Sequence, residues 1–201
     1  MNRIYWRVRN SLAIKVIFST VLLSLLVTGI TGSVLNSQLS AGVKDVNLSS
    51  ARVEARSTIF TAEYRFLLAQ GEKDSVVQKV VDDVISSATT LTSNENAREV
   101  VFLRSPGNNR ENNYEIASNL LDPNSIPSAL SEQVRKSPDL AYQYTTMSYL
   151  TGMKIKGLAI GQKVQIPNAG QYEMYIIFSL ANQEKTLDLI SRSLFLGGFI
   201  L

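Results

Sequence analysis

The sequence predicts an α+β fold in which a transmembrane helix continues into a domain of helices and an antiparallel sheet, followed by the start of a second transmembrane helix. Three observations predict it: a 20-residue apolar segment near the N-terminus, a change from helical to strand-like patterning near residue 93, and a shorter apolar segment at the C-terminus. With 201 residues, the chain is long enough for one ordinary domain plus membrane segments.

The first apolar segment, residues 16–35, contains no charged residue. As a helix it covers about 30 Å, the thickness of a hydrocarbon core. Residues 1–15 carry four basic side chains and no acid, which places this basic N-terminus in the cytoplasm. One alternative is a cleaved signal peptide, although the apolar run is longer than usual and no clean cleavage site follows it. The other is a buried core helix, which a domain this small can hardly surround.

The C-terminal segment is also apolar, but it is shorter than residues 16–35. After Ser193 come eight apolar residues, which cover only about 12 Å as a helix. We interpret residues 191–201 as the truncated start of transmembrane helix 2, with a buried terminal helix as the alternative. Residues 36–190 then form one extracytoplasmic domain, and the chain is the N-terminal part of a longer polypeptide.

Within residues 36–190 the pattern changes once. Apolar residues up to about Leu91 recur at three- and four-residue intervals, which predicts two helices separated at residues 70–72, the first continuous with the membrane helix. The remainder alternates short β-like runs with turn residues. Strands are predicted at 100–103, 114–117, 141–149, 154–166 and 172–180, with helices at 127–136 and from Asn182 onward. The order of helices and strands along the chain suits a PAS-like extracytoplasmic domain, in which a membrane-proximal helix packs on an antiparallel sheet. The order of the strands within the sheet stays open.

Composition excludes several classes of function. The chain has no histidine and no cysteine, which removes Ser-His-Asp and Cys-His nucleophiles, the usual zinc sites, haem ligation and iron–sulfur clusters. No catalytic residue, metal site or cofactor is therefore predicted within these residues. Residues 36–190 carry a net charge of −2, because the positive excess lies mainly in residues 1–15. Nucleic acid is accordingly not an expected partner.

The candidate ligand-binding residues are Arg104, Tyr142, Tyr144 and Tyr172. Tyr142 and Tyr144 share one face of a strand at a spacing of two, and tyrosine rings with their hydroxyls are able to line a pocket. Arg104, at a strand end, is suited to receive an anionic ligand. The alternative for the tyrosines is ordinary strand packing, for which tyrosine is a favoured residue.

Four segments carry a resemblance to a known family. They are VLLSLLVTGITGSVLNSQ (21–38), IPSALSEQV (126–134), AYQYTTM (141–147) and MYIIFSLANQEKTL (174–187). In this order they resemble the N-terminal region of actinobacterial MtrB-type sensor histidine kinases. The resemblance covers most of the chain.

The resemblance implies the extracytoplasmic sensor domain and transmembrane signalling portion of a two-component sensor histidine kinase, located in the cell membrane as a two-pass homodimer. It implies an envelope or osmotic signal, a cytoplasmic response regulator of the MtrA type and an envelope lipoprotein of the LpqB type as partners. ATP and magnesium belong to the family's kinase module, so these residues alone are not expected to be an enzyme. Two alternatives stay open: a two-span envelope interaction protein without kinase output, and the signal region of another output protein such as a cyclase or chemoreceptor.

Overall fold

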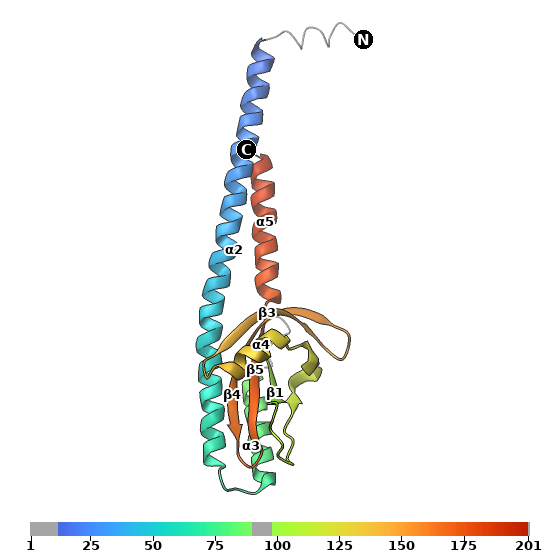
Figure 1. Cartoon of the computed structure of the whole chain (residues 1–201). Coiled ribbons are helices and arrows are strands. Elements are labelled where there is room, and N and C mark those ends of the chain that lie inside the picture. Colours follow the sequence, from blue (N-terminus) through green and yellow to red (C-terminus); the bar gives the residue numbers. More distant parts are fainter. Residues whose placement is uncertain (1–11, 90–97, 201) are drawn as a thin grey trace. The chain divides into compact units, whose positions relative to one another are not determined.

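A single helix connects the apolar N-terminal segment to the domain. In the computed structural model, helix α2 runs without interruption from Leu12 to Leu68 (Figure 1). Its residues Ile14–Thr31 are the one segment, among the residues described, that is long and apolar enough to cross a membrane, and none of this segment is buried. The predicted continuity of the first helix with the apolar segment is confirmed.

The structure describes residues 12–89 and 98–200, so most of the predicted basic N-terminus lies outside the described residues. The chain divides into two compact units. One contains Asp45–Lys185, and the other contains Met1–Lys44 together with Thr186–Leu201. The first of these units holds the sheet and every candidate ligand-binding residue.

After α2 the chain turns at Gly71, as predicted. Its φ of 86° lies in a backbone region that glycine adopts without steric cost. Helix α3 follows at Asp74–Ala88 and buries five of its side chains, at Val77, Val81, Val84, Ile85 and Ala88. Their three- and four-residue spacing is the signal from which the second helix was predicted.

Within residues 12–89 and 98–200, the sheet has five strands in the order β2-β1-β5-β4-β3, and all of their pairings are antiparallel. Its strands are β1 (Arg98–Arg104), β2 (Ile116–Ala117), β3 (Ala141–Ser148), β4 (Lys154–Ile166) and β5 (Gly170–Ser179). Two 3-10 turns, η1 (Ser118–Leu120) and η2 (Pro123–Ser125), and helix α4 (Ser128–Lys136) lie between β2 and β3. The α+β class and the antiparallel sheet are confirmed, whereas the PAS-like comparison stays a prediction.

Each face of the sheet has its own core. On one face, α2 and α3 pack against alternate residues of the strands, and the ring of Phe66 meets the edge of Phe102 with 6.1 Å between centroids. On the other face, Leu130 and Val134 of α4 pack beside Tyr175. Gly161 of β4 leaves room for this packing, because a Cβ there would lie 2.5 Å from the Tyr175 ring.

Most predicted bounds differ from the structure by one or two residues, and two of the differences have a visible cause. The strand predicted at 114–117 is reduced to β2, because the Tyr114 N–H donates to the hydroxyl of Tyr172 and not to a neighbouring strand. Helix α5 begins at Ala181, one residue before the predicted start at Asn182, and ends at Ile200. The Ala181 N–H donates to the hydroxyl of Ser179. A second membrane span within α5 stays a prediction.

Candidate functional site

Two of the predicted ligand-binding residues, Arg104 and Tyr172, lie opposite each other on β1 and β5. Both bind the carbonyl oxygen of Asn112, Arg104 through Nη2 at 2.7 Å and Tyr172 through its hydroxyl at 3.2 Å. The Tyr172 side chain is fully buried, and its hydroxyl also accepts the Tyr114 N–H at 3.0 Å. This pair therefore holds the loop before β2 against the sheet.

The other two predicted residues, Tyr142 and Tyr144, lie on β3 at the edge of the sheet. Their side chains are 40% and 41% exposed, and the guanidinium of Arg52 on α2 lies 5.4 Å from the centre of the Tyr142 ring. Strand β4 separates β3 from β5. The structure thus places the four residues in two separate pairs, and ligand binding by them stays a prediction.

The structure also reveals a buried carboxylate, Glu99, that sequence reasoning missed. Its side chain is 4% exposed, and Oε2 accepts hydrogen bonds from the hydroxyl of Ser118 and from Nδ2 of Asn119. Oε1 accepts from the hydroxyl of Tyr149 at 3.1 Å. These three donors, Ser118, Asn119 and Tyr149, are all neutral.

The backbone beside Glu99 is strained. Asn119 and Leu120 have φ values of 47° and 60°, a left-handed conformation that asparagine tolerates but that costs a residue such as leucine about 1–2 kcal/mol. In this turn the amide of Asn119 donates to the carboxylate. Burial, followed by the charge and the hydrogen bond of Glu99, raises the pKa of Tyr149 well above its ordinary value.

A second buried carboxylate, Glu173 of β5, anchors helix α4. It accepts hydrogen bonds from Ser131 at 2.7 Å, from Nε of Arg135 at 2.6 Å and from the hydroxyl of Tyr175 at 2.6 Å. Burial and the bond to Glu173 raise the pKa of Tyr175. This carboxylate has a cationic partner, Arg135, and the cluster fixes α4 to the sheet.

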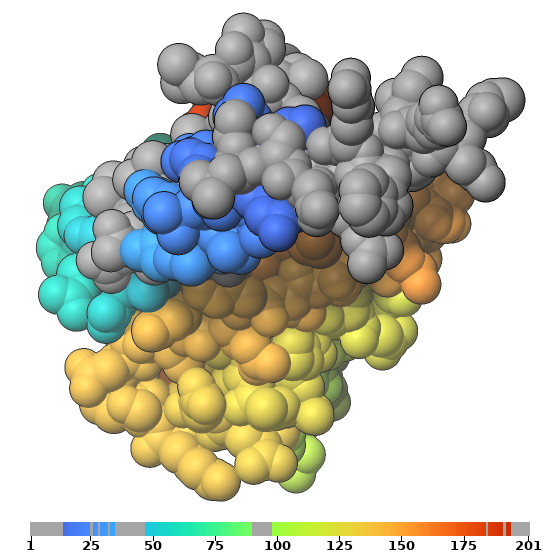
Figure 2. Space-filling view, turned by 90° about the horizontal axis from the view of Figure 1, so that it is seen from above, coloured from blue at the N-terminus to red at the C-terminus, as the bar shows by residue number. Residues whose placement is uncertain are grey.

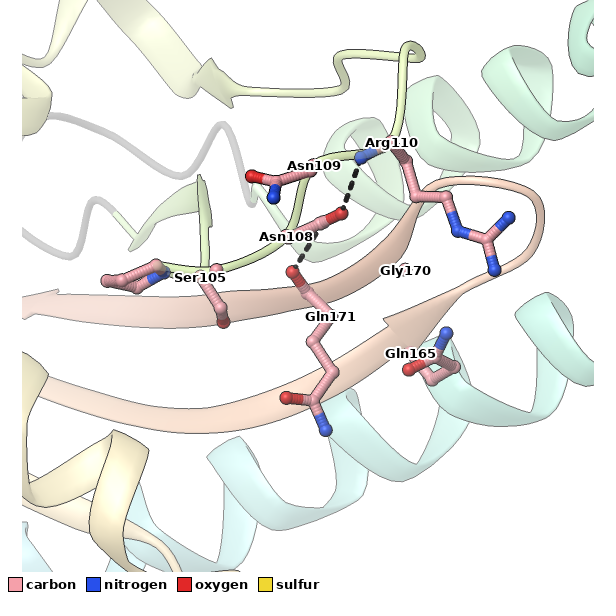
Figure 3. Close-up of a pocket in the computed structure, with 9 residues that line it drawn as sticks. Ser105, Asn108, Asn109, Arg110, Gln165, Gly170 and Gln171 are labelled. Atoms are coloured by element: carbon pink, nitrogen blue, oxygen red, sulfur yellow. Dashed lines mark hydrogen bonds between the residues drawn. The ribbon is translucent and has the colours of Figure 1, made fainter.

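An open pocket of about 550 Å³ lies where the loop after β1 meets the β4–β5 hairpin (Figure 3). Its lining is polar and contains one charged residue: Ser105, Pro106, Gly107, Asn108, Asn109, Arg110, Gln165, Gly170 and Gln171. Figure 3 shows Arg110, Gln165 and Gln171 around the same open space, one from the loop and one from each strand of the hairpin. Such a set of amides with one cation suits a small polar ligand.

Asn108 fixes the shape of this pocket. Its Nδ2 donates to the carbonyl oxygens of Ala169 and Gln171 at 2.8 and 2.9 Å, and its Oδ1 accepts the Arg110 N–H. Gly170 permits this approach, because a Cβ there would lie 2.8 Å from Oδ1 of Asn108. Ser105 is 6% exposed, and its hydroxyl has no hydrogen-bond partner in the part of the chain that the structure describes. The sequence did not predict the pocket, since its other wall lies about sixty residues away along the chain.

Metal binding finds no support in the described residues. Within 12–89 and 98–200, no three acidic side chains are arranged to hold a metal ion.

Comparison with known proteins gives a consistent result along the chain, although no family model matches it. It is 30% identical over 204 residues to "Sensor histidine kinase MtrB" of Mycobacterium leprae (strain TN), an alignment that covers 96% of this chain and 34% of that protein. The proteins of the same name from Mycobacterium tuberculosis (strain ATCC 25618 / H37Rv) and Mycolicibacterium paratuberculosis (strain ATCC BAA-968 / K-10) are each 28% identical, again over 96% of this chain. The chain is similar to MtrB sensor histidine kinases.

The similarity to MtrB kinases confirms the resemblance first seen in four short segments. The chain spans about a third of the length of these relatives. The chain contains no histidine.

Proposed function

We propose that this chain is the extracytoplasmic sensing and transmembrane signalling portion of a two-component sensor histidine kinase. The observation that carries the proposal is the similarity to MtrB kinases over 96% of the chain. In this proposal residues 36–190 lie outside the cytoplasm, and α2 and α5 each continue into a membrane span. The phosphoacceptor histidine, ATP and magnesium belong to a kinase module outside these residues.

The continuity of α2 supports a mechanical form of signalling. One helix runs from the candidate span Ile14–Thr31 to Leu68, and its C-terminal part is packed in the core of the domain. A displacement of the C-terminal part of α2 is therefore transmitted along the hydrogen-bonded backbone of this helix toward the candidate span. A stimulus acts only if it binds the two signalling states with different affinity.

Two kinds of input fit the described surface. A small polar ligand fits the pocket of Ser105, Arg110 and Gln171, whose amides and single cation are suited to a carboxylate or hydroxyl-rich molecule. A protein partner, such as an envelope lipoprotein of the LpqB type, is the other input that we propose from the family. Downstream, the proposed partner is a response regulator of the MtrA type.

A chimeric kinase tests the proposal. Residues 1–201 are joined to the cytoplasmic part of a histidine kinase with a known response regulator, and regulator phosphorylation is measured before and after an osmotic upshift. We expect phosphorylation to change with the upshift. The variant Ser49→Pro, which interrupts α2, should abolish the change, whereas Ser49→Ala should retain it. An identical response from both variants, or none from the parent chimera, would contradict the proposal.

A further inference from the structure

The pocket between the loop after β1 and the β4–β5 hairpin lies at one end of the sheet. Arg104, the last residue of β1, pairs with Tyr172 near the start of β5, and the pocket lies just beyond this pair (Figure 3). Strand β5 extends about 30 Å from Gly170 to Ser179, after which α5 begins. Figure 2 views the domain from that other end, where α4 and β3 are seen in yellow to orange. The pocket is therefore remote from the start of α5.

The charge of the lining favours a carboxylate. Among the described residues that line the pocket, Arg110 is a cation and none is acidic. The guanidinium of an exposed arginine is suited to a carboxylate, because the two planar groups match as donors and acceptors. A phosphate group, with nearly two negative charges, would leave one of them uncompensated by this lining.

The rest of the lining favours hydroxyl groups on the same ligand. The side-chain amides of Asn109, Gln165 and Gln171 each combine a donor with an acceptor, as a hydroxyl group does. Apart from Pro106, the lining consists of polar residues and glycine, so it offers little apolar surface to an acyl chain or an aromatic ring. The volume of about 550 Å³ is sufficient for a molecule the size of a sugar.

Ser105 gives an independent indication of a ligand. It lines the pocket and is 6% exposed, and its hydroxyl has no hydrogen-bond partner within residues 12–89 and 98–200. Its backbone N–H, in contrast, donates to the carbonyl oxygen of Gln171. A buried hydroxyl without a partner is unfavourable, and buried polar groups in proteins are nearly always hydrogen-bonded. A ligand oxygen in the pocket would supply the partner.

The hairpin wall of the pocket is also bonded to the segment after α2. At the β4–β5 turn, Nδ2 of Asn168 donates to the carbonyl oxygen of Glu72 at 2.9 Å and to Oδ1 of Asp74 at 3.1 Å. On the pocket side, Nδ2 of Asn108 donates to the carbonyl oxygen of Ala169 at 2.8 Å. Glu72 lies four residues beyond the last residue of α2. The turn thus contacts both the pocket loop and the C-terminal end of the long helix.

We propose that this pocket binds a small hydroxylated carboxylate, such as a sugar acid, with the carboxylate on Arg110 and the hydroxyl groups on the amides of the hairpin. A ligand that joins the loop to the hairpin displaces the β4–β5 turn, and Asn168 transmits the displacement to the end of α2. This second step rests on the proposed function, in which α2 leads to a membrane span. Because the pocket is open, we expect a dissociation constant of about 1 mM.

Ligand-observed NMR with the full chain in lipid nanodiscs tests the binding step. The probe is D-glucuronate, and two molecules serve as controls. Glucose has the hydroxyl groups without the carboxylate, and acetate has the carboxylate without the hydroxyl groups. Glucuronate should bind saturably, with an affinity at least tenfold higher than that of either control. The absence of saturable binding, or equal affinities for the three molecules, would overturn the proposal.

Two substitutions locate the ligand in this pocket. Arg110→Gln should weaken glucuronate binding at least tenfold, whereas Arg56→Gln, which removes an exposed arginine of α2 outside the lining, should leave the affinity unchanged. Ser105→Ala should weaken binding at least threefold without lowering the unfolding temperature, because its hydroxyl has no partner in the described chain to lose. Equal affinities of the Arg110→Gln and Arg56→Gln chains would also overturn the proposal.

The chimeric kinase tests the transmission step. Glucuronate should change regulator phosphorylation in the parent chimera, and Asn168→Gly should reduce this change at least fivefold while retaining the affinity. Glycine readily adopts the φ of 62° found at Asn168, so the variant removes the side-chain hydrogen bonds and keeps the turn. Equal responses of the parent and the Asn168→Gly chimera would overturn transmission through this turn.

The two measurements separate this inference from the proposed function. An osmotic response of the chimera without glucuronate binding to the chain would reject the ligand site alone. Glucuronate binding by a chimera that responds neither to the ligand nor to the osmotic upshift would reject the proposed function, and with it the transmission step.

Discussion

At the scale of single residues, the α4 face of the sheet contains two buried carboxylates in different environments. Glu173 has Arg135 as a cationic partner, whereas the partners of Glu99 are Ser118, Asn119 and Tyr149. A buried carboxylate depends on each of its hydrogen-bond donors, because each lost hydrogen bond leaves a desolvated group without compensation. The region of Glu99 is therefore more sensitive to substitution than its apolar surroundings.

The raised pKa values of Tyr149 and Tyr175 predict a loss of stability at high pH. Above about pH 10 an unfolded tyrosine releases its proton while the folded one retains it, so the unfolded state binds fewer protons and the free energy of unfolding falls as pH rises. Below that pH the contribution is fully present. Each of the two tyrosines should contribute a slope of up to about 1.4 kcal/mol per pH unit. Urea unfolding of residues 45–185, followed by circular dichroism between pH 8 and 12, measures it.

The matched variant for this prediction is Tyr149→Phe. It should unfold more easily at pH 7, by about 1–3 kcal/mol, because Glu99 loses a hydrogen bond. Its alkaline slope should be shallower than that of the parent, since one of the titrating groups is gone. A slope equal to that of the parent would show that Tyr149 is not linked to folding.

At the scale of elements, helix α2 has one apolar face that packs on the sheet and a second apolar face that is exposed. Alanines fill most of its covered face and let the helix lie close to the sheet, while Ile59 and Phe66 provide the larger contacts. Sequence periodicity predicted this helix and its end before Gly71, because both are local properties. It did not indicate which of the two apolar faces meets the sheet, because both have helical spacing.

Substitution of two phenylalanines of α2 distinguishes the covered face from the exposed face. Phe66→Ala should lower the free energy of unfolding by about 3–5 kcal/mol, because Phe66 is 1% exposed and packs against Phe102. Phe60→Ala removes the same atoms from an exposed position, so it should change stability by less than about 0.5 kcal/mol at protein concentrations too low for association. Equal losses in urea unfolding would mean that the two faces have been assigned wrongly.

At the scale of the whole molecule, the proposed topology places the sheet outside the cytoplasm. The candidate span Ile14–Thr31 and the four basic residues of segment 1–15 support this orientation. Since the chain has no cysteine, single cysteines report their own side of the membrane.

Labelling of intact cells checks the orientation. Ser86→Cys in α3 should react with a membrane-impermeant maleimide, whereas Asn2→Cys should react only after the cells are permeabilised. Labelling of Asn2→Cys in intact cells, with Ser86→Cys protected, would reverse the orientation. Equal labelling of both positions in intact cells would contradict a membrane span between them.

Local patterns in the sequence were enough to predict the helices, most of the strand positions and the apolar segment near the N-terminus. These depend on the spacing of apolar residues and on turn residues within short windows, as the bounds of β4 and the turn at Gly71 illustrate. Four short segments also sufficed for the resemblance to MtrB kinases. Such local patterns failed at residues 114 and 115, which were predicted to belong to a strand. There the hydroxyl of Tyr172, distant in the sequence, accepts the Tyr114 N–H.

Four features could be read only from the folded chain: the sheet order, the pairing of Glu99 with Tyr149, the pocket beside Asn108 and the exposed side of α2. Each depends on which residues face each other across strands and helices that are distant in the chain. In the sheet, a shift of one residue in register would turn every side chain to the opposite face. The spacing of residues along a strand does not determine its register with the neighbouring strand. The register is set by the packing on both faces of the sheet.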